Sequence, residues 1–342
     1  MRTGADYRES LRDGRDVWVM GEGQVDDVTS HPATAAMVEE YVAWYDRHFD
    51  PAWQDILLTG PDAGGKRRPL AYEIPKTSAD LQSQGDSLRA VLFLSGGNIT
   101  HTPEYGALIS LGLLNFVKSS NNSPGEVAAA EAYRESLART GRFLTFAGGG
   151  PLIGPRLSSD PSERVALRLV SESDEGIVVS GKVQMHTSTP FAEDVLITSR
   201  DELPPGSGRW PWFIVPVNAP GIRTVARRAS ARHANPFMSP LSSRFDELDA
   251  ILLLNEVFIP RERLFTGELM KRTERHSLVS WLLWHHNIGW LAKAELSLGL
   301  ALALSDAMGL KENSGTIEQL VDLAVDVQTS RSCVTAAELE PE

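Results

Sequence analysis

The hydrophobic periodicity changes twice along this chain of 342 residues, and these two changes constrain its fold more than any other feature. In the first 140 residues, apolar side chains recur at helical spacing, with candidate N-terminal caps at Ser30, Ser78 and Ser123. From about Arg142 to Pro260, apolar residues alternate with polar ones or form short β-branched runs between Gly and Pro turns. Helical spacing then returns. The sequence therefore predicts helices, an antiparallel β-domain, and helices again.

Caps, turns and breakers give approximate bounds for these elements. Helices are expected from Ser30, from Ser78 to Gly96-Gly97, from Pro103 to Leu114, from Glu126 to Thr140 before a stop at Gly141, and at 277–310 and 316–336. Strands are expected at 164–170, 177–180, 195–198, 212–217, 221–225 and 250–259. We expect an α+β protein with an N-terminal helical domain (1–141), a central β-domain (142–262) and a partial C-terminal helical bundle (263–342), the order of the acyl-CoA dehydrogenase fold.

Charge and cysteine content exclude several classes of protein. The formal net charge is −12, whereas a nucleic-acid partner requires clustered Lys and Arg. Cys333 is the only cysteine, so no intramolecular disulfide can form, and no thiolate-held cluster or other metal site is expected. A single cysteine indicates a reducing compartment. The N-terminus has no apolar signal core, so we expect a cytoplasmic protein. Lys293 and Glu295 interrupt the apolar stretch at 277–310, which favours a buried bundle helix over a membrane span.

One glycine-rich segment is a candidate for cofactor binding. Phe146-Ala147-Gly148-Gly149-Gly150 leads through Pro151 to Leu152-Ile153-Gly154-Pro155. Three consecutive glycines expose backbone N–H groups and allow a flat ring or a phosphate to approach closely. A flexible linker where the helices give way to strands explains the same run, because glycine runs usually mark loops. The residues alone leave both interpretations open.

Two further polar segments each allow more than one interpretation. Thr187 and Thr189 follow the strand that contains Gly176–Gly181, and hydroxyls at a strand end can bind the pyrimidine edge of a flavin. A polar strand terminus is the simpler alternative. His285 and His286 are adjacent on a predicted helix and point about 100° apart, so they cannot bind one metal together. We interpret them as histidines whose hydrogen bonds are satisfied within the bundle.

Five segments, in order along the chain, resemble the 4-hydroxyphenylacetate 3-hydroxylase family. They are GADYRESLRDGR (4–15), VTSHP (28–32), TPEY (102–105), DEGIVVSG (174–181) and PLSSRFDELD (240–249), the last followed by VFIP (257–260). The resemblance implies an acyl-CoA-dehydrogenase-like subunit, usually in a homotetramer, that receives reduced FAD from a separate flavin reductase. It also implies a flavin C4a-hydroperoxide that hydroxylates a phenol next to its hydroxyl group.

Carried over residue by residue, the resemblance implies an altered active site. Tyr105 stands where the family has a substrate-contacting tyrosine, His101 where it has a substrate arginine, and Phe146 where it has a histidine near the flavin. The flavin-contacting positions fall on Ala147, Gly148, Leu152, Ile153, Gly154 and Pro155, and on Thr189 with Thr187 nearby. We therefore expect His101 and Tyr105 as catalytic residues, and a substrate other than 4-hydroxyphenylacetate.

Two functions are consistent with these residues. The favoured one is an FADH2-dependent monooxygenase of an aromatic or polyketide-like small molecule. The alternative is a non-redox member of the fold, either a cyclase-like pocket enzyme or a subunit that completes a partner chain. It is motivated by Phe146, by His101 and by a C-terminal section with fewer helices than a four-helix bundle requires. We expect one of three explanations: the chain is a fragment of a longer product, a partner chain supplies the further helices, or the protein has given up the flavin. The resemblance also implies a homo-oligomer.

Overall fold

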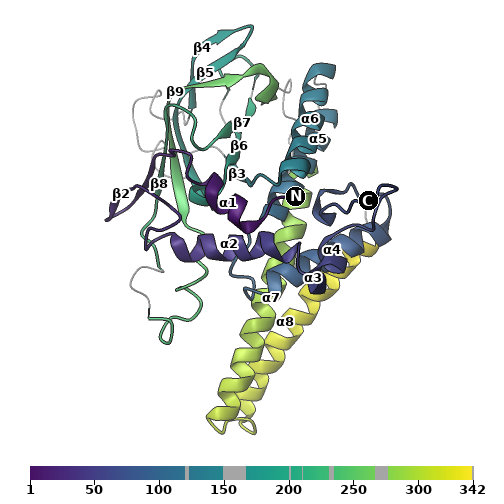
Figure 1. Cartoon of the computed structure of the whole chain (residues 1–342). Coiled ribbons are helices and arrows are strands. Elements are labelled where there is room, and N and C mark those ends of the chain that lie inside the picture. Colours follow the sequence, from purple (N-terminus) through teal and green to yellow (C-terminus); the bar gives the residue numbers. More distant parts are fainter. Residues whose placement is uncertain are drawn as a thin grey trace.

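The computed structural model describes residues 1–119, 123–148, 167–199, 202–209, 211–230, 235–265 and 276–340. Strands gather in the upper part of Figure 1, N-terminal helices lie beside and below them, and the last two helices project downward as a hairpin. The order of helices, strands and helices is the predicted one. The Leu152–Pro155 segment and the other predicted residues between 149 and 166 lie outside the described residues.

The N-terminal helices begin and end at recognisable signals. They are α1 (Gly4–Ser10), α2 (Ala35–Arg47), α3 (Pro51–Leu57), α4 (Ser78–Phe93), α5 (Pro103–Ser119) and α6 (Pro124–Thr140). Thr3, Thr77 and Ser123 form capping boxes with the carboxylate three residues later. Gly141 ends α6 in the left-handed conformation, as predicted. The helix expected from Ser30 starts later, at Ala35, because residues 27–34 first form backbone-bonded turns.

The strands form two sheets. The larger has the order β2-β1-β8-β9-β5-β4 and contains β1 (Val17–Val19), β2 (Gly23–Val25), β4 (Leu167–Ser173), β5 (Gly176–Thr187), β8 (Ile222–Ala226) and β9 (Asp249–Pro260). The smaller has the order β10-β7-β6-β3 and contains β3 (Leu144–Gly148), β6 (Asp194–Thr198), β7 (Trp212–Pro216) and β10 (Leu264–Phe265). Most pairings are antiparallel, as expected, but β1 with β8 and β3 with β6 are parallel.

Apolar clusters hold the two sheets together and attach them to helices. One cluster contains Val195 and Phe213 of the small sheet and Val179 and Leu252 of the large sheet, so the sheets pack face to face. A second cluster places the other face of the small sheet against α5, α6 and the first half of the next long helix. The division into three domains stays a prediction, and β1 and β2 from the N-terminal part join the large sheet.

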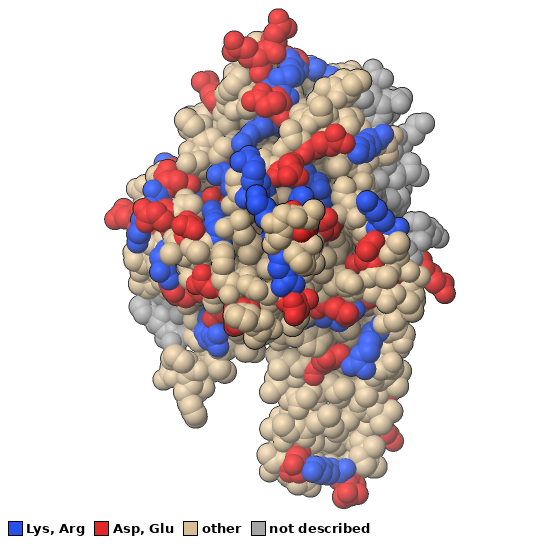
Figure 2. Space-filling model, turned by 45° about the vertical axis from the view of Figure 1, so that its right-hand side comes forward, with Lys and Arg blue, Asp and Glu red and all other residues tan. Residues whose placement is uncertain are grey.

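The C-terminal hairpin consists of α7 (His276–Ala307) and α8 (Ser314–Leu339). The expectation of a buried helix holds for the first half of α7 and is wrong for the second. Leu300, Leu302 and Leu304 are all exposed, and the projecting part of the hairpin in Figure 2 carries few charges. By length and composition α7 could cross a membrane, with 22% of its most apolar window buried. An exposed apolar surface of this kind is typical of a contact with another protein surface or a membrane.

Candidate functional site

The start of α5 is held against both β3 and α7 because two glycines allow close approach. A Cβ atom added at Gly106 would lie 2.5 Å from the Leu144 carbonyl oxygen of β3. One added at Gly112 would lie 2.6 Å from the Leu278 Cδ1 of α7. Both distances are too short for a side chain. The TPEY segment at 102–105, which opens α5, is therefore enclosed between a strand and the C-terminal hairpin.

Three histidines surround Tyr105 at this point. The centroid of the Tyr105 ring lies 4.5 Å from that of His101, 5.2 Å from that of His285 and 5.3 Å from that of His286. The rings of His101 and His286 are themselves 5.6 Å apart. The structure thus brings together the two residues predicted to be catalytic and adds two histidines that sequence reasoning had assigned to packing. In the described part of the chain, they do not form a metal-binding group.

The interpretation of the α7 histidines as satisfied is wrong for His285. Both of its ring nitrogens are buried without a hydrogen-bond partner, whereas His286 Nδ1 lies 2.8 Å from the Leu282 carbonyl oxygen. Burial lowers the pKa of both imidazoles, and the neighbouring histidines lower it further. Burial, with the Glu247 carboxylate nearby, raises the pKa of Tyr105. Near neutral pH, His285 and His286 therefore stay uncharged and Tyr105 keeps its hydroxyl proton.

Glu247 and Tyr41 hold His101 in place. The Glu247 carboxylate accepts hydrogen bonds from the Thr100 amide at 2.8 Å and from the His101 amide, and lies 3.6 Å from His101 Nδ1. This gives a structural role to the PLSSRFDELD segment, which contains Glu247. The Tyr41 hydroxyl donates to the His101 carbonyl at 2.7 Å and lies 2.8 Å from Ser188 Oγ. Tyr41 thus connects the histidine cluster to the end of β5.

The first residues of the glycine-rich segment form a strand. Phe146 of β3 pairs with Leu196 of β6, so the linker interpretation is wrong for the part up to Gly148. Phe146 is half-buried against the same apolar cluster that contains Tyr105, whereas Ala147 is buried on the opposite face, between the sheets. Gly148 ends the strand and is half-buried. Phe146 therefore lies at the interface between the small sheet and α5, where the resemblance implies a flavin, whereas Ala147 faces away from it.

The two threonines at the end of β5 differ in their surroundings. Thr187 Oγ1 donates to Asp249 Oδ1 at 2.8 Å, so its hydrogen already has an acceptor. The Thr189 hydroxyl is fully buried and has no hydrogen-bond partner. It follows Ser188, which adopts a left-handed φ of 64° and contacts Tyr41. A buried hydroxyl without a partner is costly unless a ligand completes it, so the residues present fit a flavin at this position.

Comparison with known proteins places this site in context. A family model described as the N-terminal part of 4-hydroxyphenylacetate 3-hydroxylase matches residues 3–266. The oxygenase component of a 4-nitrophenol 4-monooxygenase/4-nitrocatechol 2-monooxygenase from Rhodococcus opacus is 31% identical, over 99% of this chain and 66% of its own length. The 4-hydroxyphenylacetate 3-monooxygenase oxygenase component of Thermus thermophilus is 28% identical, over 99% of this chain and 71% of its own.

Solved structures agree with these relatives. The oxygenase component of 4-hydroxyphenylacetate 3-monooxygenase complexed with FAD and 4-hydroxyphenylacetate superposes with a TM-score of 0.88 at 27% identity, covering 99% of this chain and 72% of that one. An acyl-CoA dehydrogenase from Slackia heliotrinireducens shares the fold with a TM-score of 0.52 at 17% identity, over 76% of this chain and 61% of its own. The predicted α+β, acyl-CoA-dehydrogenase-like fold is confirmed. The chain spans about two thirds of the length of the curated relatives it matches.

Proposed function

This chain belongs to the 4-hydroxyphenylacetate 3-hydroxylase family, and we propose that it is the FADH2-dependent oxygenase component of a two-component monooxygenase acting on a small phenol. The observation that carries this proposal is the group of His101, His285 and His286 around Tyr105, linked through the Tyr41 hydroxyl to Ser188, which precedes the unpartnered hydroxyl of Thr189. A separate flavin reductase would supply the reduced cofactor. The non-redox alternative is not favoured, because relatives over the whole described fold are flavin-dependent oxygenases.

Residues on the β-side of the site would hold the cofactor. Reduced FAD, when bound, would supply the two electrons that activate O2, so that one oxygen atom of O2 enters the phenol and the other leaves as water. We assign Thr189, with its free buried hydroxyl, to a polar edge of the ring system, and Phe146 and Gly148 to its apolar surroundings. Leu152–Pro155 remain candidates from the resemblance. The packing of α5 on β3 keeps water away from this side, which preserves reactive oxygen species for the substrate.

Residues on the α7 side would handle the substrate proton. A phenol reacts with electrophilic oxygen more readily when its hydroxyl proton is withdrawn, and a neutral imidazole can accept that proton. The lowered pKa of His286 keeps its ring neutral, and its Nδ1 faces the Leu282 carbonyl, which leaves Nε2 as the nitrogen available to a substrate. Phe146 stands where the family has a histidine, and its phenyl ring cannot accept a proton. We therefore propose that His286 and His101 accept the substrate proton instead. Tyr105 positions the phenol ring by edge contacts.

This proposal predicts a labelled product and a specific loss of activity. Purified protein, a flavin reductase, NADH, FAD and 18O2 are incubated with 4-nitrophenol and other single-ring phenols, and products are analysed by mass spectrometry. We expect one labelled oxygen in a hydroxylated product. His286→Asn should lower kcat about 100-fold, as for other general bases, without weakening the binding of reduced FAD.

A histidine remote from the site provides the matched control. His31 lies in the turn before α2, near Glu22, and His31→Asn should leave kcat unchanged. If the wild-type protein consumes no oxygen and yields no labelled product with any phenol of the panel, the proposed function is wrong. Equal losses in His286→Asn and His31→Asn would reject the role of His286 alone.

The apolar half of the hairpin supports a homo-oligomer. Exposed residues of the hairpin include Leu300 and Leu304 of α7, Met308 in the turn, and Val321 and Val325 of α8. We propose that they pack against the same helices of other copies of this chain, because burial of apolar surface stabilises association. Light scattering should give a mass of two or more chains at micromolar concentration. Leu304→Glu should reduce that mass to one chain, whereas Ser297→Glu should not, and a monomeric wild-type protein would contradict the proposal.

A further inference from the structure

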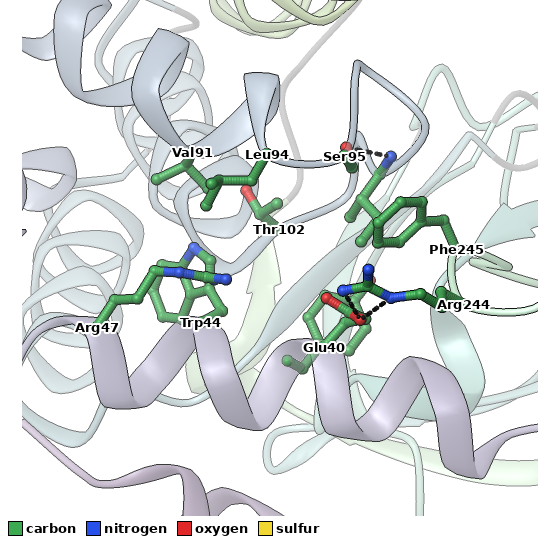
Figure 3. A pocket seen from close by; sticks show the side chains of 11 residues that line it. Glu40, Trp44, Arg47, Val91, Leu94, Ser95, Thr102, Arg244 and Phe245 are labelled. Carbon is green, nitrogen blue, oxygen red and sulfur yellow. Dashed lines mark hydrogen bonds and ion pairs between the residues drawn. The ribbon is translucent and has the colours of Figure 1, made fainter. Parts of the chain in front are cut away.

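A cavity lies beside the histidine cluster and is separate from it. Its volume is about 150 Å3, and it lies between α2, the end of α4 and residues 244–245 (Figure 3). Thr102 lines it, whereas His101 and Tyr105 contact the histidines of α7 instead. A cavity of about 150 Å3 with apolar walls is large enough for a benzene ring. The size of this cavity therefore matches a single-ring aromatic molecule.

The walls of the cavity are suited to an aromatic ring. Their apolar part consists of Tyr41, Trp44, Val91, Leu94, Ile99 and Phe245. Aromatic side chains give a flat ligand large contact areas with favourable edge and face geometries. Figure 3 shows Trp44 on one side of the cavity and Phe245 on the other, with Leu94 from the end of α4 between them.

Buried polar groups with incomplete hydrogen bonds gather at one end of this cavity. Trp44 Nε1 and Thr102 Oγ1 are buried without a hydrogen bond, and both residues line the cavity with exposed fractions of only 6% and 3%. The Glu104 carboxylate, 3% exposed, approaches both groups and also lacks a hydrogen bond of normal geometry. Three neighbouring buried groups whose hydrogen bonds to one another are incomplete are unusual in a folded protein. A ligand oxygen in the cavity would complete the two that line it.

Below about pH 7, where Glu104 is protonated, the charges around the cavity favour an anion. The guanidinium of Arg47 lines the cavity, is half-buried and lies 5.6 Å from the centroid of the Trp53 ring, but it makes no ion pair or hydrogen bond with a described residue. Glu40, on the same helix, is already paired with Arg244 at 2.7 Å. Arg47 is thus the cation without a bonded carboxylate among the lining residues, and it stands near the N–H of Trp44 and the hydroxyl of Thr102. Guanidinium groups bind carboxylates and phenolates through charge-assisted hydrogen bonds.

We propose that this cavity is a second ligand site, which binds a single-ring aromatic anion. The ring occupies the space between Trp44 and Phe245, and the anionic oxygen accepts hydrogen bonds from Arg47, Trp44 Nε1 and Thr102 Oγ1. Tyr41 lines the cavity and its hydroxyl holds the His101 carbonyl, so a bound ring contacts the residue that positions His101. The site does not depend on the proposed oxygenase activity, because its residues are not those assigned to catalysis.

Binding to flavin-free protein tests this site directly. Calorimetric titrations use benzoate as the aromatic anion and benzyl alcohol as its neutral counterpart. We expect one benzoate per chain, weakened at least tenfold by Arg47→Gln, whereas benzyl alcohol binding changes less than twofold. Leu94→Trp should abolish the binding of both probes by filling the cavity. Leu94 is 45% exposed, so the fold tolerates this larger side chain.

Two controls separate this cavity from the histidine cluster. Tyr105→Phe should leave benzoate affinity unchanged, and Arg67→Gln, on the surface outside the cavity, should do the same. Absence of benzoate binding to the wild-type protein would overturn the proposal, as would binding that Leu94→Trp leaves intact. Loss of binding in Tyr105→Phe would overturn it too, because the ligand would then occupy the cluster around Tyr105. None of these outcomes bears on labelled product formation, so the two proposals fail independently.

Discussion

The Glu104 carboxylate allows a quantitative prediction for the pH dependence of stability. It is buried, and burial outweighs its incomplete hydrogen bonds to Thr102 and Trp44, so its pKa rises from the ordinary 4.5 to about 7. The folded state therefore retains a proton that the unfolded chain has released between pH 4.5 and 7. Stability from this group is complete below pH 4.5, falls as pH rises through this window and levels off above it. At about 1.36 kcal/mol per pH unit, the full loss is about 3 kcal/mol.

Glu104→Gln removes this titration and keeps the shape of the side chain. Between pH 5 and pH 8, the advantage of the variant over the wild-type protein in free energy of unfolding should grow by about 2.5 kcal/mol. Urea denaturation at both pH values, followed by circular dichroism, measures the difference. Glu318→Gln, at an exposed position on α8, is the control and should show no pH-dependent gain. An advantage of Glu104→Gln that is the same at pH 5 and pH 8 would refute the reasoning.

Two further predictions concern packing and ion pairing. Gly106→Ala should lower the free energy of unfolding by about 1–3 kcal/mol, because its Cβ would meet the backbone of β3. Gly125→Ala, in the open first turn of α6, is the control and should not destabilise the protein. Urea denaturation of both variants measures the difference. Glu338→Ala should cost about 3 kcal/mol, because it leaves Arg89 without its buried partner, whereas Asp86→Ala removes an exposed partner and should cost under about 1 kcal/mol. Equal melting temperatures for the last two variants would contradict this.

The helices and most strands could be predicted because their signals are local. The cap residues Thr77 and Ser123 lie within one turn of the helices they start, and Gly141 lies next to the helix it ends. Strand β3 carries no such signal, since its five residues pair with β6 about fifty residues later and run into a glycine triplet. Its existence depends on a partner that the local pattern does not reveal.

The candidate site was only half visible in the sequence for a similar reason. His101 and Tyr105 lie in one short motif, so the resemblance identified them together. His285 and His286 lie about 180 residues further on, and helical periodicity does not say which other helix faces them. Adjacent histidines within an apolar helix were the one available signal. The angle of about 100° between adjacent helical positions excludes a shared metal, but it does not prevent both rings from contacting one tyrosine of another helix.

The central claim is that a flavin lies at the end of β5, beside the histidine cluster, and anaerobic titration with reduced FAD tests it most directly. We expect one reduced FAD per chain. Thr189→Val removes one hydrogen bond to the ligand, so its affinity for reduced FAD should be about tenfold lower. The same variant should unfold at no lower urea concentration, because the hydroxyl it removes has no partner in the protein. Failure of the wild-type protein to bind reduced FAD, or equal affinity in Thr189→Val, would contradict the account.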